Sequence, residues 1–184
     1  MTSLGELART GALLMRTGGA GAGTGGPPVL SEHDIVSGGA PSGVLPEGED
    51  EEPVLIRAGD VVIPVLGRGT ATRVIDEATA GAALGRNVYL LRPDPATLDP
   101  WFLAGFLRSS ANNRQASSFT TSATRLDVRR LQVPRLPLAD QQRYGERFRA
   151  VAAFEEAARL AARLGELFVQ GLYDGLTDGS ISPS

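Results

Sequence analysis

Cysteine and lysine are both absent from this sequence of 184 residues, and histidine occurs once, at His33. Without cysteine there is no disulfide and no thiol nucleophile, and one histidine is too few for the usual zinc sites. Without lysine there is no phosphate-loop lysine, no Schiff base and no nuclease centre built on two acids and a lysine. We therefore expect neither a metal nor a cofactor.

Long apolar runs are also missing. No stretch approaches the ~20 apolar residues of a membrane span, and the N-terminus lacks the basic-then-apolar order of a signal peptide. The length suits one ordinary domain with a real core plus an extension. We expect a cytoplasmic protein.

All 18 basic residues are arginine. Residues 1–52 hold two arginines and eight acids, residues 53–135 hold eleven and six, and residues 136–184 hold five and seven. A basic middle between acidic ends is typical of a domain that binds nucleic acid with part of its surface. Genomic base composition also favours arginine over lysine, so part of the excess carries no functional meaning.

A glycine-rich stretch contains Gly21, Gly23 and Gly26 in the spacing of a dinucleotide fingerprint. We reject that match because Pro27-Pro28 follow, where the fingerprint needs a helix N-terminus to hold the pyrophosphate. Residues 17–52 are predicted to be a flexible loop that ends in an acidic, solvated run. Within it, Ser31 and Asp34 are expected to cap a short helical turn that exposes His33.

Short elements make up the rest of the domain. Ser3 and Glu6 have capping-box spacing, and Asp99-Pro100 opens a second helix as its N-cap and first residue. Strands are expected at 12–15, at 61–65 after a turn at Gly59-Asp60, at 70–75 and at 87–92, with another short helix at 112–116. The predicted class is α+β, a small, twisted, mostly antiparallel sheet with short helices.

A long C-terminal helix completes the prediction. It should begin at an Asp140 N-cap, occupy residues 139–176 and leave 177–184 disordered, while Gly165 and Gly171 each cost about 1 kcal/mol of helix stability. One apolar stripe follows it, made of Tyr144, Phe148, Val151, Phe154, Ala158, Ala161, Leu164, Phe168 and Leu172. Such a stripe indicates an arm that binds a partner helix; the alternative is a terminal helix folded back over its own domain.

Residues 119–125 are rich in hydroxyl groups and lie between Arg114 and Arg125. Such a segment can bind phosphates or base edges, and it can equally be an ordinary connecting loop. The candidate DNA-binding residues are Arg68, Arg73, Arg86, Arg114, Thr120, Thr121 and Arg125. Arg129 and Arg130 rank lower, because they can instead dock the long helix.

Three stretches, taken in order, resemble the target recognition domain of type I restriction-modification specificity subunits. They are Gly59-Asp60-Val61-Val62-Ile63, residues 98–109 beginning Leu-Asp-Pro-Trp-Phe-Leu, and residues 131–142, a proline-containing strand that passes into the long helix. The C-terminal recognition part of adenine-specific DNA methyltransferases is similar. The resemblance covers residues 54–175 and implies a mixed α/β globule, here 1–138, that reads one half of a DNA site, with a helix that docks a methyltransferase subunit.

The usual specificity subunit has two globules and two helices, whereas this chain has one of each. Either two copies pair through their helices, or the chain is a fragment or stands beside another partner. The Asn/Asp-Pro-Pro-aromatic motif of adenine methyltransferases is absent, so any chemistry must come from a partner and this chain is expected not to be an enzyme. A helical adaptor that binds no DNA is the alternative, as is a detached methyltransferase recognition domain.

Overall fold

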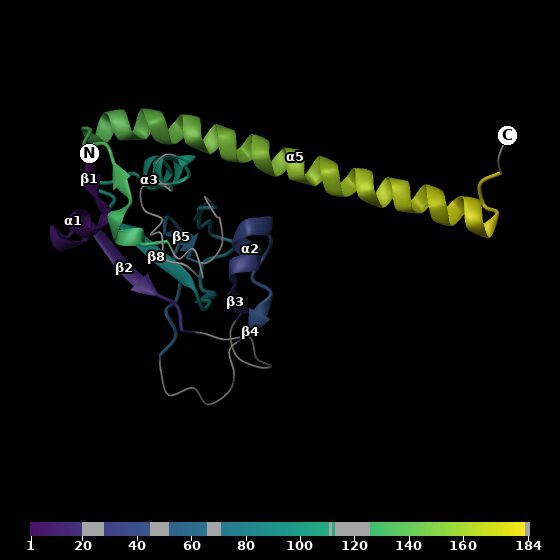
Figure 1. Cartoon of the computed structure of the whole chain (residues 1–184), viewed down its shortest axis with the longest axis horizontal. Coiled ribbons are helices and arrows are strands. Elements are labelled where there is room, and N and C mark those ends of the chain that lie inside the picture. The colour runs from purple at the N-terminus through teal and green to yellow at the C-terminus, as the bar shows by residue number, and fades with distance from the viewer. Residues whose placement is uncertain (20–27, 45–51, 66–70, 111, 113–125, 183–184) are drawn as a thin grey trace, which may run out of the picture. The chain divides into compact units, whose positions relative to one another are not determined.

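We describe a computed structural model of the chain, which defines residues 1–19, 28–44, 52–65, 71–110, 112 and 126–182. Within these residues the class is α+β, with short antiparallel strands, short helices and a long C-terminal helix, as the sequence predicts (Figure 1). The chain divides into two compact units, Met1–Phe148 and Arg149–Ser184, and each is considered by itself.

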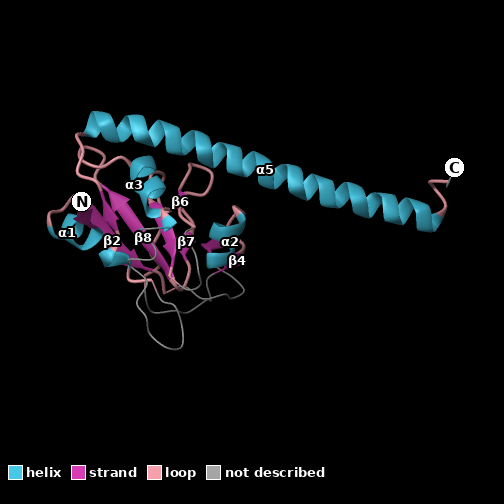
Figure 2. Ribbon diagram, turned by 45° about the horizontal axis from the view of Figure 1, so that its top comes forward, coloured by secondary structure: helices cyan, strands magenta, loops and turns pink. Residues whose placement is uncertain are grey.

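The main sheet has four strands, in the order β2-β8-β5-β6. They are β2 (Leu13–Thr17), β8 (Val88–Pro93), β5 (Val61–Pro64) and β6 (Arg73–Val74), and every neighbouring pair is antiparallel. Figure 2 shows β2 and β8 side by side as long arrows. The turn before β5 has Gly59 at φ +84°, a backbone conformation that favours glycine. The predicted strand at 70–75 is shorter than expected, because only Arg73 and Val74 pair with β5.

The central strands β5 and β8 are buried on both faces, whereas the edge strand β2 is mostly exposed. In β5, Val61 and Ile63 enter one core with Phe102 and Leu103, whereas Val62 enters a second core with Leu30. Successive side chains of a strand point to opposite faces, so a continuous apolar run such as 61–65 requires cover on both sides. A buried sheet of this kind provides a rigid base for the loops at its ends.

Residues 28–44 are predicted to belong to the flexible loop 17–52, but in the structure they form two strands and a helix. They form β3 (Pro28–Leu30), α2 (Glu32–Ser37) and β4 (Gly43–Val44), and a three-stranded sheet in the order β4-β3-β7 joins them to β7 (Ala83–Leu84). The β3–β7 pair is parallel. Strands of two or three residues carry no readable periodicity, so pairing across fifty residues decides this part of the fold.

The predicted caps are present. Ser31 and Asp34 form the complete capping box of α2, and Asp99 caps α3 (Pro100–Leu107) by accepting the N–H of Phe102 at 2.8 Å. Ser3 caps α1 (Leu4–Arg9) by accepting the N–H of Glu6 at 3.2 Å, and the Glu6 carboxylate accepts from the Thr2 hydroxyl at 2.7 Å. Helix α1 is thereby joined to β1 (Thr2–Ser3), which pairs with β9 (Gln132–Val133).

The long helix α5 spans Leu138–Asp178 as one continuous helix through Gly165 and Gly171. It begins before Asp140, because the carbonyl oxygen of Pro137 accepts the N–H groups of both Asp140 and Gln141 at 3.0 Å. Asp140 is therefore not the N-cap. It lies in the first turn, where the positive end of the helix dipole stabilises a negatively charged carboxylate. No helix in the described ranges is long and apolar enough to cross a membrane.

The first turns of α5 are fixed on α3 within the first unit. Tyr144 and Phe148 make edge-to-face contacts with Phe106, at ring centroid separations of 5.7 and 5.5 Å. The buried amide of Gln141 accepts the N–H of Asp99 at 3.0 Å and donates to two backbone carbonyls, those of Thr97 and Leu136. The first turns of α5 therefore cover their own domain, as in the alternative of a terminal helix folded back over it.

Candidate nucleic-acid interface

Backbone hydrogen bonds gather several chain segments at one end of the main sheet. The N–H of Val65, just after β5, donates to the carbonyl of Asn87, just before β8, at 2.8 Å. The N–H of Leu126 donates to the carbonyl of Val65 at 3.1 Å, and the N–H of Gly18 donates to Val88 at 3.0 Å. The ends of β2 and β5, the start of β8 and the chain at Leu126 therefore meet at this end.

Most of the predicted DNA-binding residues belong to segments that leave or rejoin the fold here. Arg68 lies in 66–70, directly after Val65, and Arg114, Thr120, Thr121 and Arg125 lie in 113–125, directly before Leu126. These five residues lie outside the described residues, and their contacts with DNA stay a prediction. The structure describes the sheet end itself, where the first segment leaves the fold after Val65 and the second rejoins it at Leu126.

Arg86 is described and lies at the same end. It is exposed in the turn between β7 and β8, and its Nε donates to the carbonyl of Gly19 at 3.2 Å. Asn87 beside it has φ +58°, an uncommon left-handed conformation that asparagine tolerates. The turn therefore links Arg86 to the end of β2.

Arg73 is placed differently. Its guanidinium donates to the carbonyl of Gly39 and to the hydroxyl of Thr79, which ties β6 to the second sheet layer. The structure does not bring Arg73 together with Arg86, and its prediction as a DNA contact stays untested. The sequence shows no sign of these partners because Gly39 lies thirty-four residues away.

Close backbone packing supports this sheet end. A Cβ atom at Gly18 would lie 2.7 Å from the carbonyl oxygen of Leu84, and one at Gly85 would lie 2.6 Å from that of Leu30. Real Cβ atoms do not approach so closely, so both positions require glycine to bring β2, β3 and β7 together. Neither glycine was singled out from the sequence, because it is the neighbouring backbone that makes each one necessary.

Asn112 fixes the point where 113–125 departs. Its side-chain amide donates to the carbonyl of Gln132 at 2.7 Å and its carbonyl accepts the N–H of Gln132 at 3.0 Å, so it pairs with β9 as a strand residue would. It also donates to Phe106 at the end of α3. Asn112 is helical, as predicted for the start of a short helix at 112–116, whose other residues lie outside the described ranges; the sequence gives no sign of its pairing with Gln132.

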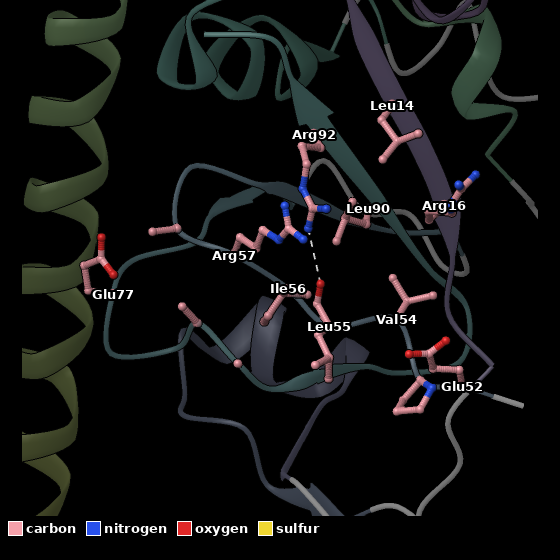
Figure 3. A pocket seen from close by; sticks show the side chains of 14 residues that line it. Leu14, Arg16, Glu52, Val54, Leu55, Ile56, Arg57, Glu77, Leu90 and Arg92 are labelled. Atoms are coloured by element: carbon pink, nitrogen blue, oxygen red, sulfur yellow. Dashed lines mark hydrogen bonds between the residues drawn. The ribbon is translucent and has the colours of Figure 1, made fainter.

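A second feature of the first unit is a pocket of about 720 Å³ between β2, β8 and residues 52–58 (Figure 3). Arg92 lies in it and holds the buried Asp60 through two hydrogen bonds of 2.7 Å, which raise the pKa of Arg92 above its usual value. Arg92 also donates to the Leu55 carbonyl, so its role is structural. The lining residues are arginines, carboxylates and small or aliphatic groups, which supply no nucleophile beside a base.

No group of His, Asp and Glu suited to a metal ion occurs among the residues that the structure describes. The electrostatic features that remain are arginines on a rigid α+β frame.

Comparisons with known proteins agree with this fold. No protein-family model matches the sequence, and no curated protein matches it. Among solved structures, a chain of a type I restriction-modification system matches with a TM-score of 0.59 and 20% identity, over 96% of this chain and 44% of that one. The HsdS subunit of Thermoanaerobacter tengcongensis matches with a TM-score of 0.56 and 22% identity, over 88% and 38%.

These similarities are similarities of fold, because the identities are low. They confirm, at the level of the fold, the resemblance to type I specificity subunits seen in the sequence. The chain spans less than half the length of both chains that it matches.

Proposed function

We propose that this chain is a sequence-specific DNA-binding subunit of a type I-like restriction-modification or DNA methylation system. Residues 1–138 read one half of a target site, and residues 139–176 act as a spacer that docks a methyltransferase subunit. The observation that carries this proposal is the common base at Val65, Asn87 and Leu126, from which the arginine- and hydroxyl-bearing segments depart. The S-subunit fold supports it.

The chemistry of those segments suits base reading. Arginine binds guanine through two hydrogen bonds, and hydroxyl groups accept or donate to either kind of base edge, each good contact contributing about 1–3 kcal/mol of discrimination. The candidates for this role are Arg68, Arg73, Arg86, Arg114, Thr120, Thr121 and Arg125, of which Arg73 is already bonded to Gly39 and Thr79. The catalytic step belongs to the partner subunit.

DNA binding by the purified chain tests this function. Anisotropy titrations on duplexes selected from a random pool, compared with unselected duplexes, should show sequence-selective binding that weakens steeply with salt. The double variant Arg114→Ala/Arg125→Ala should lose selectivity, whereas the charge-matched control Arg143→Ala/Arg147→Ala on α5 should retain it. A folded wild-type chain that binds neither duplex would leave the adaptor function as the better conclusion.

The exposed surface of α5 suits protein partners. In the second unit the side chains of Val151, Phe154, Leu164 and Phe168 are 62, 76, 56 and 68% exposed. With 3.6 residues per turn, the exposed large apolar side chains between Val151 and Phe168 cover roughly 200° of the circumference of the helix. In order around the helix they are Leu167, Leu160, Leu164, Phe168, Phe154 and Val151. A two-stranded coiled-coil seam is narrower than this. More than one partner helix is needed to cover it.

A second copy of the chain is one such partner in our proposal. Antiparallel pairing can place Phe154 of each copy over Gly165 of the other and Val151 beside Phe168, which sets large side chains against small ones. The line of Leu160, Leu164 and Leu167 then remains for a methyltransferase subunit. Tyr144 and Phe148 contribute less to either interface, since both already contact Phe106.

Light scattering after size exclusion tests the pairing. Phe154→Glu should convert a dimer to a monomer, and Gly165→Leu should do the same because the added side chain fills the space that Phe154 needs. Arg163→Ala, on the polar side of the helix, is the matched control and should leave the dimer intact. A monomeric wild type, or a Gly165→Leu dimer as tight as wild type, would remove the proposed antiparallel pairing.

A further inference from the structure

A cluster of arginines outside the predicted DNA-reading segments lies where α1 meets η1 (Val128–Arg130). Figure 1 shows the short green turn of η1 beside α1. The side chains of Arg9, Arg129 and Arg130 are all exposed there. None of their guanidinium groups has a hydrogen bond or an ion pair among the residues that the structure describes.

The three arginines share one surface because α1 and η1 are in direct contact. A Cβ atom at Gly5 would lie 3.4 Å from the carbonyl oxygen and 3.6 Å from the Cβ of Arg129. Arg9 follows Gly5 by four residues, so both occupy the same face of α1, about 6 Å apart. Arg9 is therefore a neighbour of Arg129.

This surface is rigid. Leu4, Val128 and Leu131 are at most 1% exposed, and the N–H of Leu4 donates to the carbonyl of Leu131 at 2.9 Å. Asp127 caps η1 by accepting the N–H of Arg129 at 3.2 Å. Arginines on a fixed backbone lose less entropy when they bind a ligand than arginines on a free loop do.

Positive charge at this surface exceeds the nearby negative charge. The Glu6 carboxylate is engaged by the Thr2 hydroxyl at 2.7 Å and by the Arg135 guanidinium at 2.9 Å, so it neutralises Arg135 and not Arg9. The other carboxylate on these elements is that of Asp127, against three arginine side chains. The surface therefore attracts an anion.

The position of these arginines relative to the candidate nucleic-acid interface indicates which anion they bind. Arg129 and Arg130 follow Leu126 by three and four residues, so their backbone lies within about 14 Å of the point where 113–125 rejoins the fold. A duplex read by that segment presents phosphates on both sides of a major groove that is about 12 Å wide. The alternative role of Arg129 and Arg130, docking of the long helix, has no support in the described contacts. The first turns of α5 contact the domain through Tyr144, Phe148 and Gln141 instead.

We propose that Arg9, Arg129 and Arg130 bind the phosphate backbone of the duplex whose bases the neighbouring segments read. This inference rests on the proposed DNA-binding function and adds to it a contact that carries affinity but no sequence information. Phosphate contacts of this kind set the position of a protein on DNA. Their loss should weaken binding to every duplex by a similar factor.

The test measures affinity over a salt series for the wild type and for Arg129→Ala/Arg130→Ala, on a selected and on an unselected duplex. The variant should bind both duplexes about equally more weakly, and its slope of log K against log salt should be less negative by about two, near one for each lost phosphate contact. Arg9→Ala should add a further, smaller loss. Arg129→Lys/Arg130→Lys should keep the wild-type slope, since charge and not geometry governs it.

Arg143→Ala/Arg147→Ala removes the same charge from α5 and should leave the slope unchanged. Equal thermal melting of all variants excludes a folding defect as the cause. An unchanged slope in Arg129→Ala/Arg130→Ala, beside a wild type that binds selectively, overturns this inference and leaves the DNA-binding function in place. A loss confined to the selected duplex also overturns it, because these arginines would then read bases. A wild type that binds no duplex overturns both proposals.

Discussion

Gly105 of α3 lies directly against the ring of Phe148 of α5, so closely that a Cβ atom at Gly105 would overlap the ring. The glycine therefore sets how near the two helices approach, and the cluster of Phe102, Phe106, Tyr144 and Phe148 forms around that contact. The first turns of α5 are thereby packed tightly on α3.

Replacing this glycine tests the contact. Gly105→Ala should destabilise the domain by about 1–3 kcal/mol, because overpacking at the ring outweighs the higher helix propensity of alanine. Gly171→Ala is the matched control, since nothing lies within 4 Å of a Cβ at Gly171, and it should raise helix stability by up to about 1 kcal/mol. Urea unfolding followed by circular dichroism measures both, and an equal gain in the two variants would contradict the proposed contact.

Gln141 should be the residue of α5 that is hardest to replace. Gln141→Met keeps the side-chain volume but leaves the N–H of Asp99 and the carbonyls of Thr97 and Leu136 without their partner. A fully buried unsatisfied group costs about 1–3 kcal/mol; these groups are only partly buried and water can reach some of them, so the total loss should be about 1–3 kcal/mol. Gln142→Met, at the exposed neighbouring position, should change the free energy of unfolding by less than about 0.5 kcal/mol.

The ion pair of Arg92 and Asp60 should be worth more than any other in the described part of the chain. Asp60 is 1% exposed and also accepts the N–H of Arg57 at 2.7 Å, so Asp60→Ala removes the acceptor for two residues. Arg92 keeps some access to solvent, and we expect a loss of about 3 kcal/mol, the lower end for a broken buried pair. Glu6→Gln breaks the exposed pair with Arg135 and should have a much smaller effect on stability; a similar effect of both variants would show that burial does not decide the difference.

Asp34 should make the second sheet layer sensitive to acid. Burial would raise its pKa, but hydrogen bonds from Ser31 and Ser42 outweigh that effect and hold the pKa below the usual value for aspartate. Because the folded pKa is depressed, the stabilisation is present above the unfolded value of about 4 and is lost as pH falls through the folded value. Unfolding free energies measured from pH 6 down to pH 2 should therefore decline less steeply for Asp34→Asn than for the wild type, and parallel curves would contradict this account.

Local sequence patterns sufficed for a large part of the fold. Ser31, Asp34 and Asp99 cap helices as predicted, since a cap depends on residues only three positions apart. The apolar run after Gly59-Asp60 forms β5, and the apolar periodicity beyond Asp140 forms α5, because each pattern is long enough to show its period. The α+β class and the long helix follow from these elements.

The placement of side chains depends on contacts between distant parts of the chain. Arg73 and Arg92 look alike in the sequence, yet one is bound to Gly39 and Thr79 and the other to Asp60, while Arg129 stays exposed. The apolar stripe of α5 reads as one surface, but its first aromatic rings contact α3 and the rest is exposed. No local signal separates these cases, because a hydrogen bond or a ring contact depends on which backbone lies opposite in space.

Composition and local periodicity by themselves determined the long elements β5 and α5, the caps at Ser31, Asp34 and Asp99, the arginine-rich middle and the lack of thiol and lysine side chains. Only the tertiary structure decided that Val65, Asn87 and Leu126 meet at one sheet end and that Gly5 of α1 lies against Arg129. The physical reason is that helix capping and amphipathic periodicity act over a few residues, whereas sheet pairing and helix contacts join residues tens of positions apart. Which distant residues come into contact therefore depends on how the whole core packs.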